Sequence, residues 1–472
     1  MQEQELLRRA QAFLQENKEA ILQDIAALVA IPSVAGPPAP GAPFGPGPRQ
    51  ALDAALAIAR RMGFEPHHHQ GYMGWFDLPG RQKEHIATIT HLDVVPAGEG
   101  WHFDPFCMER RGQWLIGRGT DDDKGALVYC MYLAKFLRES GVPLRYTLRT
   151  LMGCAEETGM RDVGPYLAAQ PQPAFCLSSD ALFPVCSGEK GLFEGEWTLP
   201  VPAGKVQRLQ SGDASNMIPE QAVCWLREWD PTLLLPADLS VRVEGPLFRL
   251  TARGVGAHCA MPERGVSAAG LLLDFLLQNG LLSPGEQPAF ALLQKLHRSF
   301  YGEGLGLACR DDIFGPLTCA GGILRVENGL ARQNMNIRYP SATSSGSLES
   351  ALSALAKSAG GDFRLLSASA PFYIPPEDKV LQTLMKAYRD VTGSGAPAYA
   401  WGGGTYARCF RRAVSFGPGL PEDEEKPPCV GSCHGPDEGT NLATLDQSFS
   451  VYALAVYRLQ SLTLAQLEGR PE

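Results

Sequence analysis

The sequence lacks long hydrophobic runs: no uninterrupted apolar stretch reaches the roughly 18 residues that a membrane-spanning helix needs. It also lacks an excess of positive charge, because 51 acidic residues outnumber 42 Lys and Arg and give a formal net charge of −9. These two absences argue against a membrane or a nucleic acid as the main partner. The first 34 residues are amphipathic and charged, without the apolar centre of a signal peptide, so we expect a cytoplasmic protein.

The chain also lacks C-x-x-C pairs, although it contains 12 cysteines. The nearest approach to such a pair is Cys429 and Cys433, and neither these nor Cys259 have the spacing of a four-cysteine zinc site. We therefore expect reduced, partly buried thiols without a redox role.

The pattern along the chain predicts two domains, which its 472 residues also favour. Helices are expected to about residue 30 and over 52–62, with a Pro/Gly-rich loop over 32–50 that cannot form a helix or a central strand. An apolar strand over 85–90, a helix over 125–139 and a strand over 144–153 indicate an α/β domain, its mainly parallel sheet flanked by helices. Alternating segments after residue 188, such as LSVRVEG and NMNIRYP, are typical of antiparallel strands. We therefore expect an α+β domain over 188–370, inserted between two parts of the first domain at 1–187 and 371–472.

Acidic and histidine residues follow several of the expected strands. Because ligands bind outside the carboxyl ends of strands in α/β sheets, these residues can converge. Helix capping would explain one or two of the acids in TDDDKG, and an adjacent Glu–Glu pair can be a solvated helix face. Neither explains the whole set, whose nitrogen and oxygen ligands suit Zn²⁺ or Mn²⁺. The set comprises His91, Asp93, Asp121, Asp122, Asp123, Glu156, Glu157, Asp180 and His434.

The order of the motifs resembles a known family. HLDVVPAGEGW, GRGTDDDKG, EETG, SSD, GVGAHCAMP, NIRYP, GGGTYAR and a late His occur in the order of the di-metal dipeptidases of the dipeptidase V type. These belong to the superfamily of carboxypeptidase G, aminoacylase and the acetylornithine and succinyl-diaminopimelate deacylases. The resemblance extends from IPSV to HGPDEG, which is nearly the whole chain.

The resemblance implies a site with two divalent metal ions, zinc in the first place and manganese or cobalt as alternatives. One ion would be bound by His91, Asp122 and Asp180, and the other by Asp122, Glu157 and His434, so that Asp122 bridges. Asp93 would orient His91, and Glu156 would be the general base. Asp123 would follow Asp122 through a cis peptide bond, and Asp121, where the family has a small or neutral residue, would cap the next helix.

The resemblance also implies substrate-binding residues, several of them on the inserted domain, which would act as a lid. His258 would stabilise the transition state, Arg338 would bind the terminal carboxylate of the substrate, and Asn216 would contact the substrate. Alternatives are a turn histidine for His258 and a solvated strand arginine for Arg338. The backbone of Gly402, Gly403 and Gly404 would lie close to the substrate, where side chains would not fit.

The expected function is hydrolysis of the peptide bond of dipeptides by a hydroxide that bridges the two metals, with a Glu general base. An N-acyl-amino-acid deacylase or a carboxypeptidase with the same site is an alternative, and so is a catalytically silent binding protein. We expect a monomer, with a homodimer through the lid as the alternative. The tract His67–His69 resembles a metal-binding tract but is expected to be an exposed connection.

Overall fold

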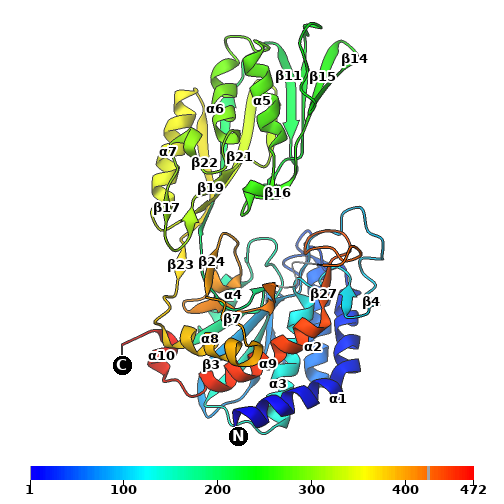
Figure 1. The fold of residues 1–472 in the computed structure, drawn as a ribbon, viewed down its shortest axis with the longest axis vertical. Coiled ribbons are helices and arrows are strands. Elements are labelled where there is room, and N and C mark those ends of the chain that lie inside the picture. The colour runs from blue at the N-terminus through cyan, green and yellow to red at the C-terminus, as the bar shows by residue number, and fades with distance from the viewer. Residues whose placement is uncertain (1, 422–425, 472) are drawn as a thin grey trace. The chain divides into compact units, whose positions relative to one another are not determined.

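The computed structural model describes residues 2–421 and 426–471 (Figure 1). The chain divides into two compact units: unit 1 comprises Met1–Ser187, Ile374–Tyr399 and Thr405–Glu472, and unit 2 comprises Gly188–Tyr373 and Ala400–Gly404. Unit 2 is thus inserted into unit 1 along the chain. The prediction assigned all of 371–472 to the first domain, whereas residues 371–373 and 400–404 cluster with unit 2.

The main sheet of unit 1 has parallel strands at its centre and antiparallel strands at both sides. The order is β1-β2-β6-β3-β7-β25-β9-β23, and β24 pairs with β9. Strands β6, β3, β7 and β25 are parallel neighbours, and the pairs β1–β2, β2–β6, β25–β9 and β9–β23 are antiparallel. The predicted α/β class is therefore confirmed, with a mixed sheet. The bounds are β1 His67–His69, β2 Met73–Leu78, β3 Gln82–His91, β6 Tyr146–Gly153, β7 Phe175–Ser178, β9 Cys186–Glu189, β23 Phe372–Tyr373, β24 Tyr399–Trp401 and β25 Ala413–Ser415.

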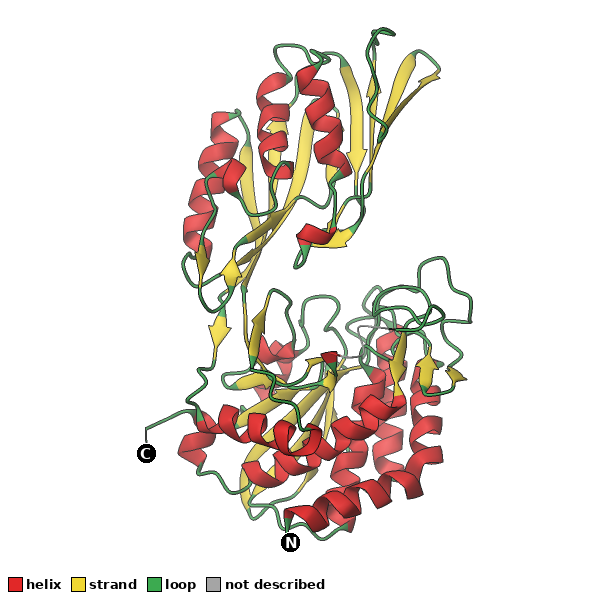
Figure 2. Cartoon of the chain, in the orientation of Figure 1, coloured by secondary structure: helices red, strands yellow, loops and turns green. Residues whose placement is uncertain are grey.

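Helices pack on both faces of this sheet (Figure 2). The ring of Phe13 on α1 lies 5.4 Å from that of Phe136 on α3 and 6.0 Å from that of Phe449 on α9, which joins these helices in one layer. On β2, Trp75 packs against the ring of Tyr166 on α4. Its neighbour Phe76 packs against the ring of Phe64, which follows α2 in the chain. Successive strand residues point to opposite faces, so α2 and α4 cover different faces. The bounds are α1 Glu3–Val29, α2 Pro46–Arg61, α3 Lys124–Glu139, α4 Val163–Ala169, α8 Lys379–Thr392, α9 Leu442–Leu459 and α10 Leu464–Glu468.

Two local expectations were wrong. Helix α2 begins at Pro46, inside the segment expected to be a loop, because proline fits the first helical turn, where its missing N–H is not needed. The tract His67–His69 is mostly exposed, as expected, but it forms the edge strand β1, paired with β2, and is not a connection. The ring of His67 lies 5.6 Å from that of Trp75, so this tract packs on the sheet.

Unit 2 contains an antiparallel sheet with three helices among its described elements. The strand order is β14-β15-β13-β11-β20-β21-β10-β22, and β19 pairs with β21. Trp197 on β10 is buried and donates its indole N–H to the carbonyl oxygen of Leu352 on α7 at 3.0 Å, which fixes this helix on the sheet. The bounds are β10 Gly191–Pro200, β11 Val206–Ser211, β13 Gln221–Leu226, β14 Leu239–Glu244, β15 Leu247–Arg253, β19 Thr318–Ala320, β20 Leu324–Glu327, β21 Leu330–Tyr339, β22 Asp362–Ser369, α5 Ala268–Gln278, α6 Gln287–His297 and α7 Ser345–Ser358.

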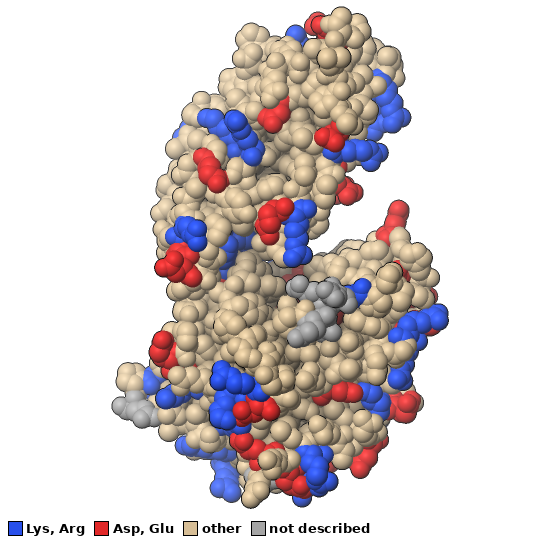
Figure 3. Space-filling view, in the orientation of Figure 1, with Lys and Arg blue, Asp and Glu red and all other residues tan. Residues whose placement is uncertain are grey.

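Basic and acidic side chains are interspersed on the face shown in Figure 3. In the part of the chain that the structure describes, no helix combines the length and the apolar character needed to cross a membrane.

Candidate active site

His91 is the last residue of β3 and lies at the carboxyl edge of the parallel strands. Its side chain is buried, and Nδ1 lies 2.9 Å from the backbone carbonyl oxygen of Asp93, so Nδ1 must donate. The other ring nitrogen, Nε2, lies 2.8 Å from Asp122 Oδ1 and 4.0 Å from Asp180 Oδ2. In the neutral ring this nitrogen carries a lone pair, and a lone pair beside carboxylate oxygens requires a cation, either a proton or a metal ion, between them.

Asp93 contacts His91 mainly through its backbone, whose carbonyl oxygen accepts the hydrogen bond from Nδ1. The nearest oxygen of the Asp93 carboxylate lies 3.6 Å from the same nitrogen. The carboxylate accepts hydrogen bonds from the backbone N–H groups of Glu156 and Glu157, each at 3.1 Å. Asp93 therefore holds the loop that follows β6 against the loop that follows β3.

The three aspartates that precede α3 separate into three environments. Asp122 Oδ1 faces His91 and its Oδ2 lies 2.9 Å from His434 Nε2, so one carboxylate lies between two imidazoles. Asp123 follows through a cis peptide bond, as expected, and accepts a hydrogen bond from the backbone N–H of His91. Asp121 pairs with Lys426 at 2.8 Å. The expected cap was wrong, because Asp123 occupies the N-cap position of α3 and its side chain makes no capping bond.

Glu156 and Glu157 point to different partners. Glu157 Oε1 lies 3.0 Å from His434 Nε2, whereas Glu156 Oε1 is buried and has no hydrogen-bond partner among the described residues. Asp180 follows β7 and completes the group around His91. The ligand atoms of His91, Asp122 and Glu157 lie within 4.8 Å of one another, and so do those of His91, Glu156 and Asp180. A buried carboxylate oxygen without a donor is typical of a position that faces a reacting group or a cation.

The electrostatics of this group favour bound cations. Hydrogen bonds to Asp122 and Glu157 raise the pKa of His434 to about 11. Burial would lower the pKa of His91, but its hydrogen bond to Asp122 and the surrounding carboxylates raise it well above its ordinary value. Burial, with the charge of Asp180, also raises the pKa of Glu156. Crowded carboxylates and imidazoles that attract protons so strongly form a donor set that fits divalent metal ions.

The candidate substrate-binding residues of unit 2 are neighbours within that unit. His258 ends β16 (Ala257–His258), which pairs with β12 (Met217–Ile218), and its Nδ1 accepts a hydrogen bond from the N–H of Ala260 at 3.1 Å. The carbonyl oxygen of Asn216 accepts from the N–H of Cys259 at 2.9 Å. Burial raises the pKa of the Cys259 thiol to about 12, and the positive charge of Arg338 opposes this shift, which places Arg338 beside the same segment.

Arg338 is buried on β21 and is not on a solvated strand face. Its Nε donates to Asn336 Oδ1 at 2.8 Å. The glycines that follow β24 pack against their own unit: a Cβ on Gly403 would lie 2.6 Å from the Trp401 ring, and one on Gly402 would meet Ala260 at 3.5 Å. Gly404 lies in the same irregular segment.

Sequence reasoning missed several residues beside the carboxylate group. Lys426 contacts Asp121, and Arg118 and Glu438 form a buried ion pair next to the loops of Asp122 and His434. The quoted motifs GRGTDDDKG and HGPDEG contain both members of this pair, but nothing in the sequence indicated that they meet. Among the described residues, the two metal-capable groups given above do not include His67–His69.

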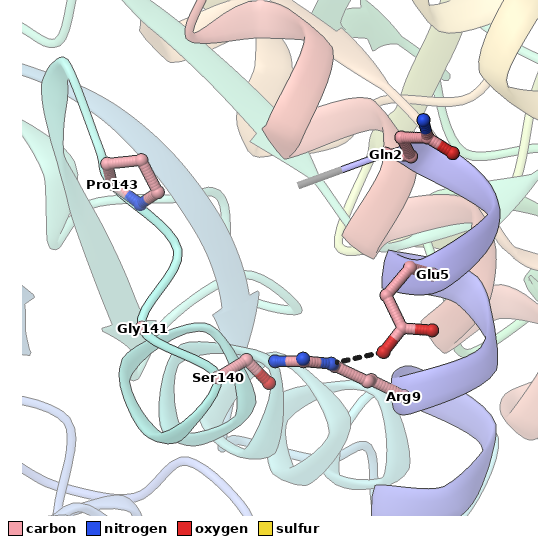
Figure 4. Close-up of a pocket in the computed structure, with 6 residues that line it drawn as sticks. All are labelled: Gln2, Glu5, Arg9, Ser140, Gly141 and Pro143. Carbon is pink, nitrogen blue, oxygen red and sulfur yellow. Dashed lines mark hydrogen bonds and ion pairs between the residues drawn. The ribbon is translucent and has the colours of Figure 1, made fainter.

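A surface depression lies at the start of α1, beside the loop after α3 (Figure 4). Arg9 and Glu5 pair across its wall at 2.7 Å, so the charge of the Glu5 carboxylate is already neutralised. It contains none of the candidate site residues and is lined by Gln2, Glu5, Arg9, Ser140, Gly141 and Pro143.

Comparisons with known proteins indicate the family and the fold. The model of peptidase family M20/M25/M40 matches residues 87–458. A β-Ala-Xaa dipeptidase of Lactobacillus delbrueckii subsp. lactis is 32% identical over 461 residues, which cover 94% of this chain and 96% of the relative. The fold is similar to that of human carnosine dipeptidase 1, with a TM-score of 0.61, 14% identity and coverage of 97% and 99% of the two chains. It is also similar to YxeP of Bacillus subtilis, described as a dinuclear metal-binding peptidase, with a TM-score of 0.54, 10% identity and coverage of 96% and 99%.

The fold and the site therefore define a peptidase of the two-domain α/β type. The chain belongs to peptidase family M20/M25/M40.

Proposed function

We propose that the protein is a metal-dependent dipeptidase that binds two divalent ions in unit 1. The observation that carries the proposal is the position of Asp122, whose two oxygens lie 2.8 Å from His91 Nε2 and 2.9 Å from His434 Nε2. A carboxylate between two imidazoles is suited to bridge two cations. The residues that would hold the ions are His91, Asp122 and Asp180 for one, and Asp122, Glu157 and His434 for the other.

The donor set favours zinc, because imidazole nitrogen and carboxylate oxygen are its common ligands, and it also accepts manganese or cobalt. Bound ions would polarise the scissile carbonyl group and lower the pKa of the attacking water. The relatives described as dipeptidases support dipeptides as the substrate class.

Glu156 is proposed as the general base and acid. Its buried Oε1 has no donor among the described residues, so this oxygen can accept a proton from the attacking water as the water oxygen bonds to the carbonyl carbon. Glu156 then returns the proton to the amine as the C–N bond breaks. The hydrogen bonds from Glu156 and Glu157 to Asp93 hold both residues of this loop by their backbone, which leaves their side chains available for different tasks.

Residues of unit 2 are proposed to recognise the substrate. Arg338 would bind the carboxylate of the dipeptide, since a guanidinium group forms paired hydrogen bonds with a carboxylate. His258 would donate to the oxyanion of the transition state, with Asn216 and the backbone of Gly403 and Gly404 as further contacts. We propose that the active form is a cytoplasmic monomer.

The test is amine release by metal-stripped protein that has been reloaded with Zn²⁺ or Mn²⁺. The substrates are free dipeptides, N-acetylated amino acids, C-terminal amides and tripeptides, and Glu156→Gln is the blank. Glu286→Gln serves as the matched control, because Glu286 is a buried glutamate of unit 2 that accepts backbone hydrogen bonds. Cleavage confined to free dipeptides supports the proposal. Cleavage of acylated amino acids instead would make the protein a deacylase, and metal binding without any turnover would make it a binding protein.

A further inference from the structure

Arg118 and Glu438 form an ion pair that is almost completely buried, with 1% and 0% of their surfaces exposed. Removing two charges from water is costly, and further hydrogen bonds to both groups offset part of this cost. The two residues come from segments that are 320 positions apart in the chain. The destinations of their remaining hydrogen bonds therefore indicate what the pair does.

The second oxygen of Glu438 binds the loop that carries Asp122. Glu438 Oε1 accepts hydrogen bonds from the backbone N–H groups of Gly119 at 2.9 Å, Asp121 at 3.2 Å and Asp122 at 3.2 Å. Three N–H groups on one carboxylate oxygen fix the path of this loop. The backbone from which the Asp122 side chain projects is thereby held by Glu438.

The second nitrogen of Arg118 binds the loop that carries His434. Arg118 Nη2 donates to the carbonyl oxygens of His434 and Gly435, each at 3.2 Å, and makes longer contacts of 3.4 Å with those of Pro96 and Ala97. His434 has a φ of 64°, a left-handed conformation that costs a residue other than glycine about 1 kcal/mol or more. Its surroundings must hold such a conformation, and Arg118 binds the carbonyl oxygens of the two peptide bonds that follow His434.

A second ion pair in unit 1, between the buried Arg149 and the partly exposed Asp77, provides the contrast. Arg149 on β6 forms paired hydrogen bonds with Asp77 on β2 at 2.7 and 2.8 Å, and its other contacts are Tyr166 and Gln170. This pair links strand to strand and to α4 and contacts none of the candidate ligands. Arg118 and Glu438 instead bind the backbones of Asp122 and His434, whose side chains meet at 2.9 Å.

We propose that Arg118 and Glu438 are positioning residues of the metal centre, which fix Asp122 and His434 at the separation that two bound ions require. The inference rests on the proposed function for the presence of the ions. Because Asp122 contributes to both ions, loss of Glu438 weakens both. Because His434 contributes to one, loss of the Arg118 contact to its carbonyl weakens one.

The experiment measures Zn²⁺ binding to purified, metal-stripped full-length protein by competition with a chromogenic chelator. Glu438→Gln keeps the size of the side chain but replaces the carboxylate that faces the guanidinium group of Arg118 with a neutral amide. Arg118→Lys keeps a positive charge but cannot bind Glu438 and the carbonyl of His434 together. The matched controls are Asp77→Asn and Arg149→Lys, which make the same changes in the other pair. Thermal unfolding of the metal-free proteins is measured beside each titration.

We expect Glu438→Gln to raise the Kd of both Zn²⁺ ions by about tenfold to a hundredfold. Arg118→Lys should raise the Kd of one ion by a similar factor and leave the other tight, and the controls should bind Zn²⁺ as the unchanged protein does. If Glu438→Gln is insoluble, the test rests on Arg118→Lys: one tight and one weakened Zn²⁺ ion support the proposal, and two tight ions overturn it. Unchanged Zn²⁺ affinity in both variants overturns the proposal, as does equal weakening in the controls.

Zn²⁺ binding needs no substrate, so the two proposals can fail separately. If the protein without substitutions binds two Zn²⁺ ions tightly but hydrolyses no dipeptide, the proposed function is refuted. The Zn²⁺ titrations of the variants still test the role of Arg118 and Glu438 in that case.

Discussion

Replacement of Asp93 by Asn tests whether this carboxylate holds the catalytic loop. The side chain is completely buried and accepts two backbone hydrogen bonds, from Glu156 and Glu157, each at 3.1 Å. An amide offers one oxygen, so one N–H group loses its acceptor and faces an NH₂ group. A hydrogen bond to a charged group contributes about 1.5–3 kcal/mol, so we expect a loss of about 2 kcal/mol.

This free energy translates into a rate. If the loss falls on the alignment of Glu156 and Glu157, kcat/KM decreases by about 30-fold, since about 1.4 kcal/mol corresponds to a factor of ten. The hydrogen bond of His91 Nδ1 should survive, because its acceptor is the backbone carbonyl of Asp93. We therefore expect Asp93→Asn to keep binding metal through His91 while it loses turnover.

The assay compares kcat/KM of metal-saturated Asp93→Asn and Glu286→Gln on the same free dipeptide. Glu286 accepts backbone hydrogen bonds from Ser283, Lys205 and Val206, so its variant should lose a similar free energy of unfolding. Its kcat/KM should remain that of the unchanged protein. Equal loss of activity in both variants, or unchanged kcat/KM in Asp93→Asn, would refute the reasoning.

Three further predictions concern the two units and the metal ions. Burial lowers the pKa of His297 to about 4, and its ring meets Ser267 at 2.9 Å and Gln333 at 2.8 Å. Since the folded pKa lies below the ordinary value of about 6.5, protonation of His297 removes about 3 kcal/mol of stability as the pH falls from about 6.5 to about 4. Denaturant unfolding should therefore show a fall that is smaller by about this amount in His297→Gln. Zn²⁺ at about 100 times its Kd should stabilise the folded protein by about 2.7 kcal/mol, seen as a higher Tm that a chelator reverses. Arg338→Lys should raise KM for free dipeptides by about tenfold to a hundredfold, which steady-state kinetics would reveal.

The strand ends could be predicted from the sequence because apolar runs and turn residues mark them locally. β3 and β6 flank α3, as expected, and their parallel pairing brings His91 opposite Gly153, three residues before Glu156. The spacing in the chain is enough to indicate this convergence, since parallel strands present their carboxyl ends at one edge of the sheet.

The partners of individual oxygens could not be predicted. Asp121 was expected to cap a helix because it precedes one, but Lys426 lies 305 positions away and pairs with it. Asp93 was expected to orient His91, and the sequence did not indicate that its backbone carbonyl would contact the ring while its carboxylate binds another loop. Such choices depend on which donors the folded chain brings within about 3 Å, and a pattern of residue types does not contain that information.

The division of residues between the units leads to a last expectation. The ligand candidates and Glu156 belong to unit 1, whereas His258, Asn216 and Arg338 belong to unit 2. Within unit 1 the ligands are held by hydrogen bonds to Asp93, Arg118 and Glu438, and these bonds involve no residue of unit 2. Substitution of Arg338 or His258 should therefore change KM or kcat without changing the Kd for Zn²⁺. A change in Zn²⁺ affinity in His258→Ala would contradict the assignment of metal binding to unit 1 alone.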